Sequence, residues 1–115
     1  MSNRFFHILV GFLCSSAFLR AAEPQRLTTD GTLRFSPVFN GLHEVVFAVH
    51  DQPNLVAIKL LKLKDGSQER LHPSLTAHQF DPAFSADGRY HCFCLSANSP
   101  QMVLVIQDKD RKSVV

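Results

Sequence analysis

The stretch FDPAFSADGRYHCF, from Phe80 to Phe93, contains the turn signal that decides the fold class. A short apolar run ends at Ser85-Ala86-Asp87-Gly88, and a second apolar run follows it. This pattern is typical of a β-hairpin with a four-residue loop, in which the glycine takes a positive φ after a type I turn. We therefore expect Gly88 to be a backbone requirement and Asp87 to form the turn rather than to act as a catalytic acid.

The same hairpin occurs upstream as FSPVFNGLHEVVF, from Phe35 to Phe47. Each copy carries three phenylalanines at equivalent positions: Phe35, Phe39 and Phe47 in the first, and Phe80, Phe84 and Phe93 in the second. The second copy has one more residue between its second and third phenylalanines. In the first copy Asn40-Gly41 replaces the longer loop, which predicts a tight type I′ turn. Pro37 and Pro82 hold the same place in the two copies, and each is expected to begin a strand, where proline is tolerated. The period is therefore about 45 residues, and periods of about 40–45 residues are typical of propeller blades.

Each copy continues with further short strands. EVVFAV (Glu44 to Val49) and YHCFCL (Tyr90 to Leu95) are apolar on both faces, which predicts burial on both sides. The expected third strands are LVAIKL and MVLVIQ, and a turn at Asp65-Gly66 precedes a short fourth strand, ERL. No amphipathic helix is expected after Ala22. Four short strands in each repeat are the unit of a β-propeller.

The second copy resembles the repeat of TolB-like, WD-type β-propellers. That repeat has proline, an aromatic residue, Ser-Pro-Asp-Gly, a basic residue and an apolar strand ending in phenylalanine and serine. The matching positions are Pro82, Phe84, Ser85, Asp87, Gly88, Arg89, Phe93 and Ser96, with Ala86 where proline is usual. RLTTDG, from Arg26 to Gly31, is similar to the segment that leads into such repeats. The resemblance implies an all-β fold of two four-stranded antiparallel blades, an incomplete propeller.

The expected organisation is a signal peptide at residues 1–22, a degenerate first propeller-type repeat at 23–71 and a second repeat at 72–115. Arg4 precedes an almost uncharged run from Phe5 to Leu19. That run is shorter than the ~20 residues that span a bilayer, and it has the length of a secretory segment, ~7–15 residues. Cleavage after Ala22 is expected, which predicts a periplasmic or secreted protein.

The charge balance argues against nucleic acid as a partner. Arg4 and Arg20 account for the formal charge of +2, so residues 23–115 hold ten basic and ten acidic side chains. A chain without net charge has no basic field for nucleic acid or an anionic membrane. The run of Lys59, Lys62 and Lys64 alternates with leucines, which indicates the solvated face of a strand.

No catalytic, metal or cofactor residue is predicted. Cys92 and Cys94 lie two residues apart on one face of a strand, too far apart for a disulfide, and are expected to be small core residues. The histidines His43, His50, His72, His78 and His91 have no ligand spacing and are interpreted as solvated turn residues. His78 with Asp81 offers only two metal ligands. Asp30, Asp51, Asp65 and Asp87 are interpreted as turn residues with no partner that would perturb a pKa.

Two blades do not close a propeller, which typically has four to eight. Three interpretations stay open: a fragment of a longer propeller, a subunit of an oligomeric ring, or a two-sheet sandwich. The resemblance implies a noncatalytic, exported protein-interaction module. Its expected partners are a protein or a cell-envelope component, further blades, or other copies of itself. The alternative is the propeller portion of an exported serine peptidase whose catalytic domain is not in this chain.

Overall fold

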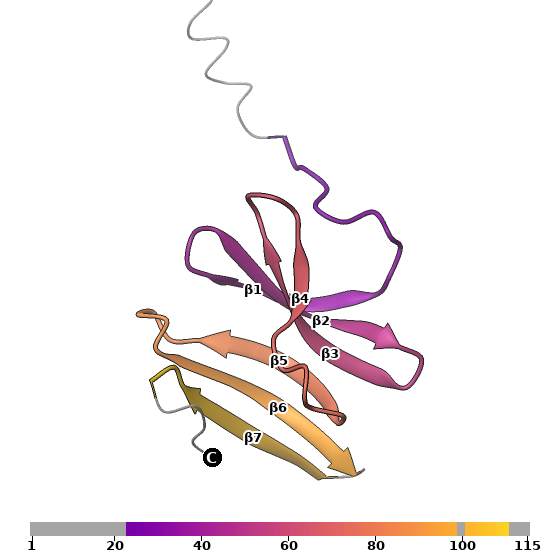
Figure 1. Cartoon of the computed structure of the whole chain (residues 1–115), viewed down its shortest axis with the longest axis vertical. Coiled ribbons are helices and arrows are strands. Elements are labelled where there is room, and N and C mark those ends of the chain that lie inside the picture. Colours follow the sequence, from indigo (N-terminus) through magenta and orange to yellow (C-terminus); the bar gives the residue numbers. More distant parts are fainter. Residues whose placement is uncertain (1–22, 99–100, 111–115) are drawn as a thin grey trace, which may run out of the picture.

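The computed structural model describes residues 23–98 and 101–110, which form two antiparallel sheets (Figure 1). The first sheet has the order β1-β2-β3-β4, and the second has the order β5-β6-β7. The strands are β1 (Arg34–Asn40), β2 (Glu44–Gln52), β3 (Leu55–Lys62), β4 (Gln68–Arg70), β5 (His78–Phe84), β6 (Tyr90–Asn98) and β7 (Gln101–Asp108). Each sheet is a meander in which consecutive strands pair. The all-β class is confirmed.

The hairpin turns differ by one residue between the two copies, as the sequence predicts. In the second copy the Ser85 N–H donates to the Tyr90 carbonyl, and Gly88 has a φ of 73°. In the first copy Asn40 pairs with Glu44, which leaves a loop of three residues. The predicted two-residue type I′ turn is therefore wrong. That turn needs a positive φ at two central residues, whereas only Gly41 has one in this loop.

A β-bulge precedes the proline of each repeat. The pairing register shifts between Phe35 and Val38 in β1 and at the equivalent place in β5. The bulge residues Ser36 and Asp81 have φ values of 54° and 53°, and both strands begin earlier than the prolines at which the sequence predicts their start. The Ser36 hydroxyl donates to Asp81 Oδ1 at 2.9 Å. Equivalent residues of the two repeats, 45 positions apart, thus meet in space.

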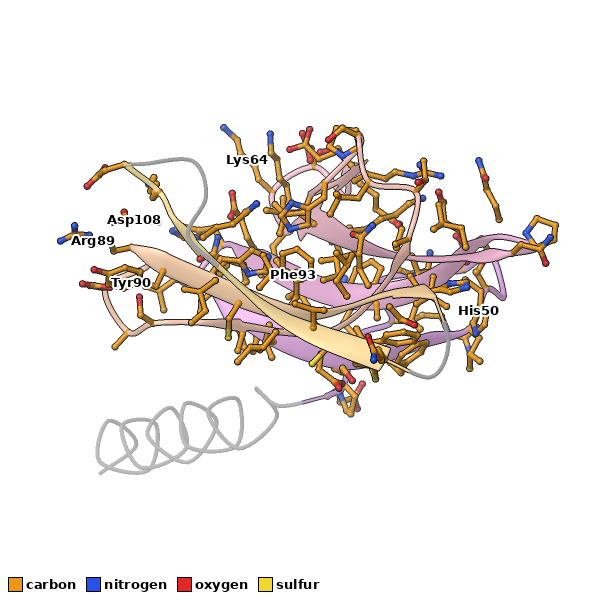
Figure 2. The ribbon with its side chains drawn as sticks, turned by 90° about the horizontal axis from the view of Figure 1, so that it is seen from below. His50, Lys64, Arg89, Tyr90, Phe93 and Asp108 are labelled. Carbon is orange, nitrogen blue, oxygen red and sulfur yellow. The ribbon has the colours of Figure 1, made fainter. Side chains whose placement is uncertain are left out.

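The main core lies between the two sheets. Val46, Ile58 and Leu60 of the first sheet pack with Phe93 of β6, and all four are buried. Phe93 points from the second sheet into the interior (Figure 2). Burying such a side chain stabilises the folded state by about 2–3 kcal/mol. Phe93 therefore joins the two sheets into one core.

The faces of β2 and β6 are buried to different extents. β2 is buried on both faces, as predicted, because Phe47, Val49 and Leu61 form a second cluster on the far side of the first sheet. The Arg34 guanidinium lies 5.3 Å from the centre of the Phe47 ring. Among the side chains of β6 that the structure describes, only His91 and Phe93 are buried, and both lie on one face, so the prediction of burial on both faces is wrong for this strand. Cys92 and Cys94, on the other face, are half-buried free thiols, so the prediction of core cysteines is wrong.

The edge of β3 that faces away from β2 is hydrogen-bonded in two ways. β4 pairs with one end of it, and Lys59 is opposite Arg70. Beyond β4, the Val56 N–H donates to His78 Nδ1 at 3.0 Å, and the Ile58 N–H donates to Gln79 Oε1 at 3.3 Å. Two side chains of β5 therefore satisfy the backbone where β4 ends, and they fix the second sheet to the first.

Several sequence predictions concern the ends of the chain. The predicted signal peptide, residues 1–22, lies outside the described residues. In the second repeat three strands are described, and the region expected to hold a fourth runs into residues 111–115, which are also outside. Residues 26–29, RLTT, are similar in sequence to RLHP at residues 70–73, which begins at the last residue of β4, but they form no strand. In the described ranges, no helix has the length and apolar character needed to cross a bilayer.

Candidate functional site

Two histidines that are far apart in the sequence meet at one end of the core. His72 lies in the segment between β4 and β5, and His91 is the second residue of β6. Their Nε2 atoms are 3.0 Å apart, and both residues are buried. Their rings are nearly parallel, at 12°, with centroids 5.1 Å apart. Imidazoles whose Nε2 atoms point straight at each other at this distance have centroids about 5.3 Å apart. The pair is therefore an N–H···N hydrogen bond.

The backbone selects the tautomers of the neutral pair. His91 Nδ1 lies 3.2 Å from the Ala83 carbonyl oxygen, which can only accept, so Nδ1 carries the proton. In neutral His91 the Nε2 atom then has the lone pair. His72 must donate its Nε2–H to that lone pair. The two rings thus share one proton between their facing nitrogens.

An aromatic ring stacks on each member of the histidine pair. Phe93 stacks on His72 with centroids 4.4 Å apart, and Phe84 stacks on His91 at 4.5 Å. Burial, with a contribution from the His91 charge, lowers the pKa of His72 to about 4. Burial also lowers the pKa of His91. Both rings are therefore neutral near pH 7.

The interpretation of all histidines as solvated turn residues is therefore wrong for His72 and His91, and also for His78, which lies half-buried in β5. His43 and His50 are exposed, as expected. Little in the sequence indicates the pair, because its members are separated by 19 residues and belong to different structural elements. The only signal is that His91 occupies a position in the predicted strand where the alternation places it on the same face as Phe93.

The histidine pair lines a cavity of about 410 Å³. Arg89, Asp108 and Lys109 are the charged residues of its lining, and Arg89 Nη2 is 3.2 Å from Asp108 Oδ2. Figure 2 shows Arg89, Tyr90 and Asp108 together at this end of the second sheet. The other lining residues are Asn40, Leu71, Phe84, Gly88 and Gln107. No serine, threonine or cysteine lines this cavity in the described part of the chain.

His78 and Asp81 have separate partners and separate roles. His78 accepts the backbone N–H of Val56, and Asp81 accepts the hydroxyl of Ser36. Both side chains therefore link the two sheets. Within residues 23–98 and 101–110, no three histidine, cysteine or acidic side chains are grouped so that they could hold a metal ion.

The prediction that the turn aspartates lack perturbing partners is wrong. Asp87 forms the predicted turn, accepting from the Ser85 hydroxyl and the Arg89 N–H, and these bonds lower its pKa. The pKa of Asp30 is lowered by its hydrogen bond with Arg34, and that of Asp65 by its bond with Ser67.

Asp51 has the most extensive contacts of these four aspartates. Its carboxylate pairs with Lys59 at 2.6 Å and also with Arg70, and these partners lower its pKa. The side chains come from β2, β3 and β4 respectively. Lys59 is therefore part of an ion-pair cluster rather than only a solvated residue.

The most exposed apolar strand is β7. Met102, Val103, Leu104 and Ile106 have exposed fractions of 55%, 49%, 57% and 38%. β7 is the last strand of its sheet, so one of its edges has no neighbouring strand among the described residues. Large exposed apolar areas on soluble proteins mark interaction surfaces. This edge is the second candidate site, beside the histidine cavity.

Comparison with known proteins gives no family for this sequence: no protein-family model matches it, and no curated protein matches it significantly. The class that the structure defines is a chain of two packed antiparallel sheets, each a meander.

Proposed function

We propose that this chain is an exported, noncatalytic protein-interaction module of the β-propeller type, and that it binds its partner through β7. The observation that supports this most directly is the difference between β7 and β3. Lys59 lies opposite Phe47, and Val105 lies opposite the equivalent Phe93. In this register Met102, Leu104 and Ile106 of β7 correspond to Val56, Ile58 and Leu60 of β3.

The corresponding residues differ in burial. Val56, Ile58 and Leu60 are buried under the second sheet, whereas their counterparts in β7 are exposed. The face that the first sheet uses to bind the second sheet is thus repeated on the second sheet with nothing covering it in the described structure. A face that binds one sheet inside the chain has the shape and polarity to bind another protein.

The propeller-type interpretation is supported by the repeat itself. Both sheets are meanders, and the first strand of each sheet, β1 or β5, carries a bulge before its proline at an equivalent place in the repeat. The chemistry of the β7 surface favours protein over nucleic acid. It consists of apolar side chains, whereas a nucleic-acid surface needs clustered lysine and arginine.

Site-specific photo-crosslinking tests this function. A photo-reactive amino acid replaces Leu104 in cells that express the full chain, and the control replaces Lys64, an exposed residue of the β3–β4 turn. We expect a discrete crosslinked protein product at Leu104 and none at Lys64. The absence of any discrete product at Leu104, with the chain folded and present at normal levels, would contradict the function.

A further inference from the structure

The sequence of β7 reads nearly the same in both directions. From Gln101 to Gln107 it is Gln-Met-Val-Leu-Val-Ile-Gln, with Leu104 at the centre. Glutamine is matched by glutamine, valine by valine, and methionine by isoleucine, a side chain of similar size. Antiparallel pairing of two such strands about Leu104 would therefore place similar residues opposite each other at every position.

The other outer strands of the two sheets are protected against pairing with another chain. β1 and β5 each contain a proline and a bulge, and β4 has only three residues, two of them charged. Short length, proline, bulges and charge are the devices that keep strand edges from associating. β7 has eight residues with no proline, and its only charge is Asp108, at its end. Among the described strands it is the one edge without protection.

We propose that two copies of the chain pair through β7, antiparallel, about a two-fold axis at Leu104. The proposal rests on the proposed function and names a second copy of the chain as the partner. Pairing would join the two described three-stranded sheets into one continuous sheet and satisfy the backbone groups of the β7 edges, which have no neighbouring strand among the described residues. The interface is isologous, so one surface serves both partners and the assembly closes at the dimer.

The contacts at such an interface are complementary. Leu104 lies opposite the same residue of the second copy, and Met102 lies opposite Ile106 on the same face. Val103 and Val105 pair on the other face. Apolar and β-branched pairs of this kind stabilise antiparallel strands.

The lack of charge on β7 indicates that its pairing partner is a neutral strand, unlike the charged β4 that pairs with β3. β4 brings Arg70 opposite Lys59, and the Asp51 carboxylate between them removes the repulsion. From Gln101 to Gln107, β7 has no charge to balance, so a neutral strand fits it. A charged segment such as the one around Arg26 would place an unpaired charge there.

Sedimentation of the full chain tests the pairing. The chain is purified with reductant present, and its N-terminus is identified by mass spectrometry. Its mass in solution is then measured at protein concentrations from about 1 to about 200 µM, so that dimer dissociation constants in this range can be determined. We expect a monomer–dimer equilibrium with no larger species. Leu104→Lys places two ammonium groups opposite each other and should raise the dimer dissociation constant at least tenfold.

The matched control is Leu42→Lys, which makes the same change at an exposed leucine (85%) of the β1–β2 loop and should leave the dimer unchanged. Circular dichroism and thermal melting show whether each variant is folded. Leu104→Glu should also be monomeric. Mixing it with Leu104→Lys should restore a one-to-one dimer, because opposite charges then face each other only if residue 104 lies on the two-fold axis.

The outcomes separate the two proposals. A wild-type chain that stays monomeric at the highest concentration, or a dimer that Leu104→Lys does not weaken, overturns pairing through β7. If the charge-swapped mixture fails to dimerise, the two-fold axis is not at Leu104 and the inference fails. In each case a crosslink from Leu104 to a different protein would still support the interaction function.

Discussion

The histidine pair predicts a specific dependence of stability on pH. Burial lowers the pKa of His72 from 6.5 to about 4, so between these values the unfolded chain binds a proton that the folded chain excludes. The free energy of unfolding is therefore fully retained above pH 6.5 and falls as the pH drops toward 4. For this shift, proton linkage gives a loss of about 2 kcal/mol between pH 7 and pH 5. Because the cavity admits solvent, which screens the charge, we expect about 1 kcal/mol.

Urea denaturation followed by circular dichroism at pH 7, 6 and 5, at constant ionic strength, measures this loss. The lowered pKa values of Asp51 and Asp87 affect stability mainly below about pH 4, outside this window. His72→Gln should remove much of the pH dependence, whereas His43→Gln, at an exposed loop residue, should leave it unchanged. A wild-type chain equally stable or more stable at pH 5 than at pH 7 would refute this reasoning.

Three substitutions test other features by the same urea assay. Asp51→Asn removes the carboxylate that Lys59 and Arg70 share, and it should lower the free energy of unfolding by about 1 kcal/mol. The loss should be smaller at high salt, and a loss that does not depend on salt would argue against an ionic effect. Gln79→Leu leaves the buried Ile58 N–H without its acceptor and should cost about 1–3 kcal/mol, and a loss near zero would show that this bond does not matter. Gly88→Ala should cost about 1–2 kcal/mol from its positive φ alone, because a Cβ there meets no atom within 4 Å, and Gly88→Asn should cost less.

Local patterns predicted most of the strands. The two triplets of phenylalanine and the turn glycines located each hairpin, because alternation and turn chemistry act over a few residues. The expected strands Glu44–Val49 and Leu55–Leu60 lie within β2 and β3 of the structure. The one-residue difference between the two loops was also correct, although the type of the shorter turn was not.

The candidate sites depend on contacts that local patterns do not contain. His72 and His91 meet because the segment after β4 packs against the beginning of β6, which no spacing in the sequence indicates. The contacts of His78 and Gln79 with the edge of β3 depend equally on how the sheets pack. The apolar character of β7 was visible in the sequence, but its exposure was not, because an apolar strand is normally buried.

The order of the strands along the chain has a consequence for folding kinetics. Every neighbouring pair of strands within a sheet is consecutive in sequence, so each sheet assembles from hairpins that close in about 1–10 µs. Docking of the sheets requires contacts such as Leu60 with Phe93, which join distant parts of the sequence and form more slowly. The face formed by Val46, Ile58 and Leu60 therefore stays exposed after its own sheet has formed. Aggregation during refolding is expected to begin at that face, so changes that slow docking should lower the refolding yield even where the folded state is stable.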